Sequence, residues 1–229
     1  MKTIGLIGGM SWESTVPYYQ IINECVKERL GGLHSAKIVL YSVEFDEIER
    51  CQSEDRWEDA GKILAEAAAG LEMAGADFIL ICTNTMHKVF EQVQAAVTVP
   101  LIHIADATGE ALKAADIRKV GLLGTRYTMQ QDFYKGRLAE AGFEVCVPGD
   151  RFISELNRII FEELCVGLIR EDSRRFFAEA IADLKEQGCE GVILGCTEIG
   201  LLVRPEDSVL QVFDTTVIHA QAAAEKALE

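Results

Sequence analysis

Short apolar runs alternate with longer segments of helical periodicity along the whole chain. The apolar runs predict strands over residues 3–7, 37–43, 78–82, 101–104, 120–123, 144–147, 192–194 and 209–213. The segments between them predict helices over residues 15–30, 56–74, 86–96, 106–115, 128–141, 151–167, 171–187 and 215–228. Strands that alternate with helices in this way are typical of parallel sheets covered by helices on both faces, so we predict an α/β fold.

The chain also resembles itself. Segment 65–83 aligns without gaps on segment 178–196, and an earlier pair agrees, because residues 4–8 match residues 120–124. The spacing between the two copies is nearly the same in both comparisons. The chain is therefore predicted to contain two similar halves.

We expect these halves to be two parallel-sheet α/β domains related by a pseudo-two-fold axis. The first is predicted to comprise residues 1–99 plus 214–229, and the second residues 100–213. Ligands of such sheets bind outside the carboxyl ends of the strands, so the active site is expected in the cleft between the two domains.

Small and polar residues follow the strands in both halves. The repeat pairs residues 8–11 (Gly-Gly-Met-Ser) with residues 124–127 (Gly-Thr-Arg-Tyr), and residues 83–85 (Thr-Asn-Thr) with residues 196–198 (Cys-Thr-Glu). Backbone N–H groups and hydroxyls at such turns suit a carboxylate ligand. A cysteine at a helix start, as we expect for Cys196, would have a lowered pKa and act as a thiolate.

Composition excludes several classes of function. The chain has 22 Lys and Arg against 37 Asp and Glu, a net charge of −15, so nucleic acid and anionic membrane surfaces are not expected as partners. Seven cysteines without a Cys-x-x-Cys pair, with only four histidines, offer no zinc-site spacing. No apolar run approaches the ~18 residues that span a bilayer, and the first residues already resemble a strand rather than a signal peptide. We expect a reduced, cytoplasmic protein.

Two similar halves suit one chemistry in particular. Racemisation at an α-carbon needs a base on one face of the carbon and an acid on the other, and the two groups exchange roles with direction. A pseudo-symmetric site can supply one such group from each half.

Three motifs carry a family resemblance across essentially the whole chain. They are Ile-Gly-Leu-Ile-Gly-Gly-Met at residues 4–10, Cys-Thr-Asn-Thr-Met-His at residues 82–87 and Leu-Gly-Cys-Thr-Glu at residues 194–198. With them the chain resembles the aspartate/glutamate racemase family. The resemblance implies a homodimeric enzyme that uses two cysteines, no cofactor and no metal, with an acidic amino acid as its substrate.

The first catalytic position departs from the family pattern. Most relatives have a cysteine directly before the Asn-Thr pair, whereas here Thr83 precedes Asn84 and Cys82 lies one place earlier. Successive side chains of a strand point to opposite faces, so Thr83 is expected to face the substrate and Cys82 to point away, unless a bulge corrects the register. By resemblance, the second cysteine, Cys196, handles the proton of the L-enantiomer. We therefore expect Cys196 and Thr83, or Cys82, to be catalytic, with activity biased towards L-substrates.

The resemblance also implies the substrate-binding residues. The turns that hold the α-carboxylate contain Met10, Asn84, Thr85 and Thr197, and a further contact pair is formed by Thr125 and Thr128. Gln52 occupies the place of an arginine that usually meets the distal carboxylate, with Arg50 nearby, in a segment expected to be a loop. His87 is expected to form a hydrogen bond behind the site. Glu198 is either a group that tunes Cys196 or a solvated carboxylate.

Other functions remain open. A maleate isomerase, a hydantoin racemase or a decarboxylase of the same superfamily would use the same scaffold. A binding protein for acidic amino acids could keep the cleft after losing a catalytic thiol. A nucleotide-dependent oxidoreductase is disfavoured, because the glycine-rich turn at residues 5–9 lacks the G-x-G-x-x-G spacing.

Overall fold

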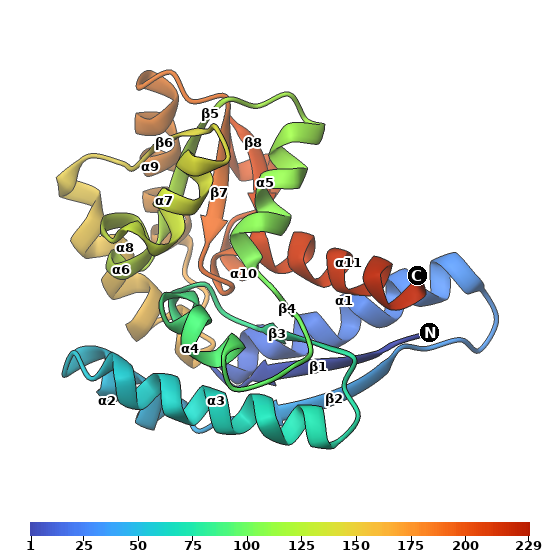
Figure 1. Ribbon diagram of the computed structural model, residues 1–229. Coiled ribbons are helices and arrows are strands. Elements are labelled where there is room, and N and C mark those ends of the chain that lie inside the picture. The colour runs from blue at the N-terminus through green and yellow to red at the C-terminus, as the bar shows by residue number, and fades with distance from the viewer. The chain divides into compact units, whose positions relative to one another are not determined.

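The computed structural model describes residues 1–229, and the chain divides into two compact units. Unit 1 comprises Met1–Ile104 together with His219–Glu229, and unit 2 comprises Ala105–Ile218. In Figure 1, unit 1 runs from blue to green and includes the dark red C-terminal helix. The first and last residues of the chain both belong to unit 1, where the Lys2 N–H donates to the Ala227 carbonyl at 2.8 Å.

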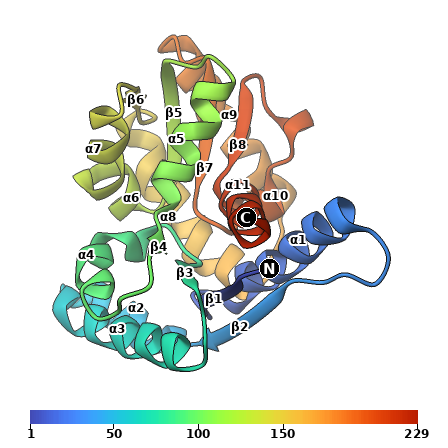
Figure 2. The ribbon, with the colours of Figure 1, turned by 45° about the vertical axis from the view of Figure 1, so that its right-hand side comes forward.

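A four-stranded parallel sheet with the order β2-β1-β3-β4 forms the centre of unit 1. Its strands are β1 (Thr3–Gly8), β2 (Lys37–Ser42), β3 (Phe78–Ile81) and β4 (Leu101–Ile102). Its helices are α1 (Trp12–Leu30), α2 (Phe45–Ser53), α3 (Trp57–Met73), the 3-10 helix η1 (Thr85–Val89), α4 (Phe90–Gln94) and most of α11 (Thr215–Leu228). Helices α2 and α3 cover one face of this sheet, and α1 and α11 cover the other (Figure 2).

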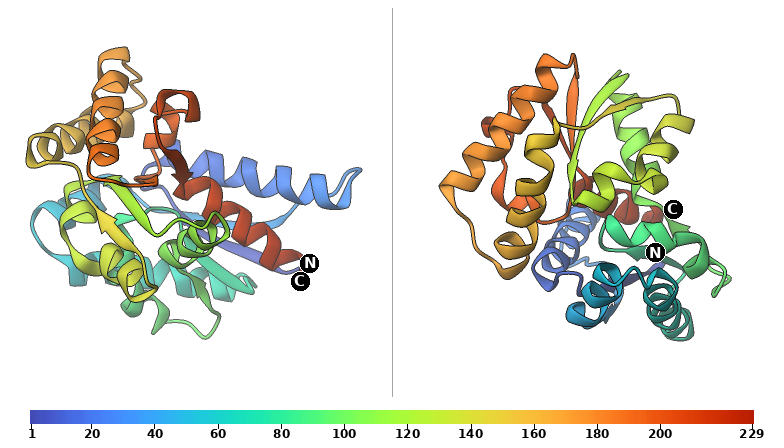
Figure 3. Two further views of the ribbon diagram at one scale, coloured as in Figure 1. Left: turned by 90° about the horizontal axis from the view of Figure 1, so that it is seen from above. Right: turned by 90° about the vertical axis from the view of Figure 1, so that its left-hand side faces the viewer.

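Unit 2 has the same architecture, with a parallel sheet in the order β6-β5-β7-β8. Its strands are β5 (Lys119–Gly124), β6 (Glu144–Cys146), β7 (Gly191–Gly195) and β8 (Gln211–Asp214). Its helices are α5 (Ile104–Ala114), α6 (Arg126–Gln130), α7 (Asp132–Glu140), α8 (Asp150–Glu162), η2 (Leu164–Val166), α9 (Glu171–Glu186), α10 (Ile199–Leu202) and η3 (Pro205–Asp207). Helices α8 and α9 pack on one face of the sheet, as the right view of Figure 3 shows.

The strand registers confirm that the sequence repeat is a structural repeat. In unit 1, β1 pairs with β3 so that Ile4 lies opposite Phe78. In unit 2, β5 pairs with β7 so that Val120 lies opposite Gly191. The sequence alignment matches Ile4 with Val120 and Phe78 with Gly191, so the same register is used in both halves. The prediction of two α/β halves with parallel sheets is therefore confirmed.

Side chains of β3 alternate strictly between the two faces of the sheet. Phe78 and Leu80 pack with α1 and α11, whereas Ile79 and Ile81 pack with α2 and α3. All four side chains are fully buried. This continuous apolar run is typical of a parallel strand covered on both faces.

Several predicted boundaries differ from the structure, and two of the differences have a clear physical reason. The segment expected to be a loop after β2 forms α2, because the Glu44 carboxylate accepts the N–H groups of Asp46 and Glu47 and so caps the helix. The strand expected over residues 101–104 ends at Ile102, since the Ile104 N–H donates to the His87 ring instead of a neighbouring strand. No helix combines the length and the apolar character that crossing a membrane requires.

His219 connects three elements inside unit 1. Its side chain is fully buried, with Nε2 3.0 Å from the Ile102 carbonyl and Nδ1 3.0 Å from the Tyr18 hydroxyl. Burial lowers the pKa of His219 from 6.5 to about 4. Between pH 6.5 and 4, His219 therefore stays neutral in the folded chain but binds a proton in the unfolded chain.

This difference predicts how stability depends on pH. Because the pKa of His219 is lower in the folded state, its contribution to the free energy of unfolding is lost as the pH falls from 6.5 towards 4, by about 3 kcal/mol in total. Replacing His219 with Gln is expected to flatten the fall in that interval. Urea unfolding at several pH values measures it, with the exposed His34→Gln as the control. A slope unchanged in His219→Gln would contradict the assignment.

Candidate functional site

The predicted residues of the first half gather at the carboxyl ends of β1 and β3 in unit 1. They are all buried, and they are Met10, Gln52, Thr83, Asn84 and Thr85. They lie in the turn between β1 and α1, in the turn between β3 and η1 together with the first residue of η1, and in α2. Buried polar side chains at the carboxyl ends of parallel strands are typical of a ligand site.

The turn after β1 depends on a glycine and a threonine. Gly9 has φ of +89°, and a Cβ at this position would lie 2.4 Å from the Val43 carbonyl oxygen. The Thr15 hydroxyl accepts the Gly9 N–H at 2.9 Å and donates to the Ser11 carbonyl at 2.8 Å. These contacts hold the backbone on both sides of Met10 in one conformation.

The register at the end of β3 separates Cys82 from Thr83. The Cys82 N–H still donates to the Ile7 carbonyl at 2.9 Å, so the ladder continues without a bulge. The Cys82 side chain has no exposed surface and packs in the cluster that contains Leu80 and Tyr18, under α1 and α11. Burial alone raises the pKa of Cys82 well above its ordinary value. Thr83, the next residue, keeps 8% of its surface exposed.

Gln52 and Arg50 have different environments on α2. Gln52 is buried, and its Nε2 lies 3.1 Å from the Met86 sulfur. Arg50 is exposed and pairs with Asp46 at 3.1 Å. Gln52 is therefore the residue of the two that lies within the first-half cluster.

The predicted residues of the second half gather in the same way at the carboxyl ends of β5 and β7 in unit 2. Thr125, Thr128, Cys196 and Thr197 are all buried there. Thr125 begins α6, and its hydroxyl lies 3.2 Å from that of Thr128. The Thr128 methyl group lies against Gly195, so this pair stands beside the strand end that carries Cys196.

Glu198 is a direct partner of Cys196. The Cys196 thiol donates to Glu198 Oε2 at 2.9 Å, and the Thr197 hydroxyl donates to the same oxygen at 2.9 Å. Glu198 is only 2% exposed, so the alternative of a solvated carboxylate is wrong. In the sequence, the only indication of this pairing was the position of Glu198, two residues after the cysteine and directly at the end of a strand.

The surroundings of Cys196 favour its protonated thiol over the thiolate. Burial, the Glu198 charge and the nearby Cys165 raise the pKa of Cys196 well above its ordinary value. The expectation of a lowered pKa at a helix start is therefore wrong. The following helix α10 has only four residues, and its field is outweighed by desolvation and by an adjacent carboxylate.

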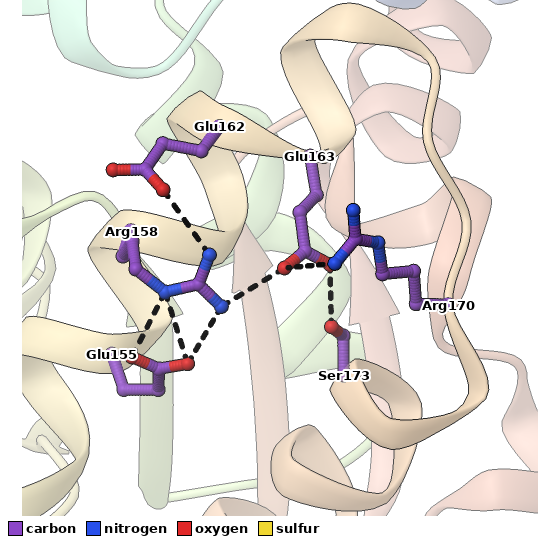
Figure 4. Close-up of polar contacts among 6 residues, drawn as sticks. All are labelled: Glu155, Arg158, Glu162, Glu163, Arg170 and Ser173. Carbon is purple, nitrogen blue, oxygen red and sulfur yellow. Dashed lines mark hydrogen bonds and ion pairs between the residues drawn. The ribbon is translucent and has the colours of Figure 1, made fainter.

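A polar network holds the segment that carries Cys165. The carboxylate of Glu163, 2% exposed, accepts the Ser173 hydroxyl at 2.5 Å and the Arg158 guanidinium at 2.9 Å (Figure 4). Burial acts to raise the pKa of Glu163, but these two hydrogen bonds and the charges of Arg170 and Arg158 together outweigh it and lower that pKa. The network joins α8 and α9 at the start of η2, which in turn contacts α10 behind Cys196.

His87 also has a defined place. It is buried in η1, with Nδ1 2.8 Å from the Thr83 carbonyl oxygen. The expected hydrogen bond behind the site is thus present, and its partner is the backbone of the candidate catalytic residue.

Comparisons with known proteins agree with this geometry. A model of the Asp/Glu/Hydantoin racemase family matches residues 7–223. The chain is 25% identical to the broad specificity amino-acid racemase RacX of Bacillus subtilis, over 96% of this chain and 95% of that protein. Among solved structures it is similar to a candidate Asp/Glu racemase of Yersinia pestis, with 56% identity and a TM-score of 0.92, over the full length of both chains. An aspartate racemase homologue of Pyrococcus horikoshii OT3 has 42% identity and a TM-score of 0.86, again over the full length of both chains. The chain belongs to the Asp/Glu/Hydantoin racemase family.

Proposed function

We propose that this protein is a racemase that works without a cofactor on aspartate or glutamate, exchanging the α-proton between the two faces of the α-carbon. The observation that carries the proposal is the buried hydrogen bond from Cys196 to Glu198, at the strand end that corresponds, in the repeat, to the strand end of Thr83. The names of the relatives support the reaction class and the acidic substrate.

Cys196 and Glu198 act together on the proton of the L-enantiomer. The Sγ–H bond breaks as its proton passes to Glu198 Oε2, 2.9 Å away, and the thiolate then takes the α-proton of the substrate. The pair carries one negative charge before and after the internal transfer, so no additional charge is buried. The positively charged ammonium group of the amino acid favours the thiolate when substrate is bound.

Thr83 acts on the opposite face. Its hydroxyl can protonate a carbanion, because an alcohol is a far stronger acid than the α-C–H bond of an amino acid. It is a poor base for the reverse step, since an alcohol ionises much less readily than a thiol. The enzyme therefore removes the α-proton more readily from the L-enantiomer than from the D-enantiomer.

Thermodynamics limits how this asymmetry can appear. The two enantiomers have equal free energy, so kcat/KM for inversion must be equal in the two directions. A bias towards L-substrates then appears as exchange of the L α-proton with solvent without inversion, or as different kcat and KM values that compensate. Proton exchange and inversion must be measured separately.

The remaining residues of the two clusters bind the substrate in this proposal. The turns that contain Met10, Asn84, Thr85 and Thr197, with the Thr125 and Thr128 pair, hold the α-carboxylate. Gln52 meets the distal carboxylate with one neutral hydrogen bond instead of a bidentate ion pair, which leaves both aspartate and glutamate acceptable. Its contact with the Met86 sulfur is a weak one that a carboxylate oxygen can replace.

The first prediction concerns Cys196. Purified, reduced protein in D₂O without added cofactor is expected to remove the α-proton signal of L-aspartate or L-glutamate in ¹H NMR spectra. Cys196→Ala is expected to slow this exchange by about 10²-fold or more, because it removes the acid–base group of that face. The control is Cys25→Ala, which changes a partly buried cysteine of α1 that lines a pocket next to α11. Absence of exchange from all four enantiomers of aspartate and glutamate would exclude the racemase and favour a binding protein.

The second prediction concerns the opposite face. Thr83→Cys is expected to increase α-proton exchange of the D-substrates by about 10-fold or more, because a thiolate forms more readily than an alkoxide. Cys82→Ala should leave both exchange rates unchanged and lower only the stability of the protein, since this thiol packs in the core. The opposite pattern, with activity lost in Cys82→Ala and unaffected by Thr83→Cys, would transfer the role to Cys82.

The third prediction separates the reactivity of the thiol from catalysis. Glu198→Gln removes the charge that helps to raise the pKa of Cys196, so alkylation of this thiol by iodoacetamide should begin at a lower pH. Racemisation should nevertheless fall by about 10²-fold, because the acceptor of the thiol proton is lost. Peptide mass spectrometry measures alkylation, with the exposed Glu206→Gln as the control. If alkylation of the thiol and racemisation both became faster, or both became slower, the proposed proton path would be contradicted.

A further inference from the structure

Three of the four histidines form a buried cluster in unit 1. His87, His103 and His219 are at most 4% exposed. The ring centroids of His87 and His103 are 4.5 Å apart, and those of His87 and His219 are 5.9 Å apart. A buried cluster of titratable groups at a strand end needs either a partner for every polar atom or a function.

The partners of His87 determine its tautomer. Nδ1 lies 2.8 Å from the Thr83 carbonyl oxygen, which can only accept a hydrogen bond. Nε2 lies 3.1 Å from the Ile104 backbone nitrogen, which can only donate. His87 therefore carries its hydrogen on Nδ1 and is neutral. A second proton would point at an N–H group, and burial together with His103 and His219 holds the pKa of His87 well below its ordinary value.

His219 has the opposite tautomer for the same kind of reason. Its Nε2 lies 3.0 Å from the Ile102 carbonyl, so the hydrogen is on Nε2, and its Nδ1 accepts the Tyr18 hydroxyl. The two rings thus hold the backbone on either side of His103. His219 has no hydrogen bond to Thr83, which makes it a matched control within the same cluster.

The backbone geometry explains why the Thr83 carbonyl needs a hydrogen bond from a side chain. Helix η1 begins with a 3-10 hydrogen bond from the His87 N–H to the Asn84 carbonyl at 3.0 Å. An α-helical bond from this N–H would have reached the Thr83 carbonyl four residues back. The His87 side chain takes the place of that missing bond. It also links the Thr83 peptide to Ile104, the first residue of α5.

We propose that His87 is a positioning residue for Thr83, which it serves by holding the Thr83 carbonyl with Nδ1–H and the Ile104 N–H with Nε2. This role rests on the proposed function of Thr83 as the second acid–base group. Rotation of the peptide after Thr83 would turn its hydroxyl away from the substrate. A weakly acidic hydroxyl depends more strongly on alignment than a thiol does, so the position of Thr83 matters for inversion.

A pair of amide variants tests each half of the contact. The amide of Asn reaches about as far as Nδ1 of His, so His87→Asn keeps a donor for the Thr83 carbonyl. The amide of Gln reaches about as far as Nε2, so His87→Gln keeps an acceptor for the Ile104 N–H and loses the donor to Thr83. The two variants are similar in polarity and both are uncharged.

The informative measurement is the ratio of inversion to α-proton exchange for an L-substrate in D₂O, from chiral chromatography and ¹H NMR of the same samples. Exchange needs only Cys196, whereas inversion also needs Thr83. The ratio is expected to fall about tenfold in His87→Gln and to stay within about twofold of the wild-type value in His87→Asn. In His219→Gln, stability in urea should fall while the ratio stays unchanged. The ¹⁵N shifts of the His87 ring should show the Nδ1–H tautomer in the wild-type protein.

Different failures have different meanings. A hydrogen on Nε2 of His87, an unchanged ratio in His87→Gln, or an equal fall in His219→Gln would overturn the positioning role while the racemase remains. Absence of α-proton exchange in the wild-type protein would overturn the proposed function, and the role of His87 with it.

Discussion

A strand that is covered on both faces can present only every second side chain in the same direction, and the chemistry proposed for this protein depends on that constraint. Leu80 and Cys82 lie on the face covered by α1 and α11, and the ladder continues through the Cys82 N–H without a bulge. The cysteine nearest to the usual family position is therefore committed to the core, and the next residue, Thr83, is left at the strand end. A shift of one residue in the sequence has exchanged a thiol for a hydroxyl.

Burial governs the second half in a different way. Removing Cys196 and Glu198 from water would be costly for either group alone, but the thiol gives its hydrogen to the carboxylate and the pair needs only one charge. The result is a thiol that is inert towards solvent and has a base within hydrogen-bond distance. In the proposed mechanism, desolvation and catalysis are compatible because the proton moves inside the pair, and the positive charge of a bound substrate then favours the thiolate.

The periodic part of the fold could be predicted from the sequence, whereas the local electrostatics could not. The repeat of segment 65–83 in segment 178–196 identified the two halves, because strand and helix periods survive divergence of the side chains. Helix α2 was missed because its capping residue, Glu44, lies in an acidic segment that resembles a solvated loop. The raised pKa of Cys196 was missed because it depends on depth of burial and on the direction in which Glu198 points, and neither is visible in a residue pattern.

The two halves thus give the proposed acid–base groups different degrees of geometric support. In unit 2 the thiol of Cys196 and the carboxylate of Glu198 are adjacent, so a small displacement of the backbone moves both together. In unit 1 the motif has no carboxylate two residues after Thr83 to correspond to Glu198. The backbone of Thr83 is held instead by His87, a neutral histidine whose tautomer is set by two backbone groups. When a hydroxyl takes the place of a thiol, the rate of proton transfer depends less on a favourable pKa and more on the alignment of the group with the substrate. A residue that never touches the substrate can then decide whether a carbanion is returned to the face it came from or inverted.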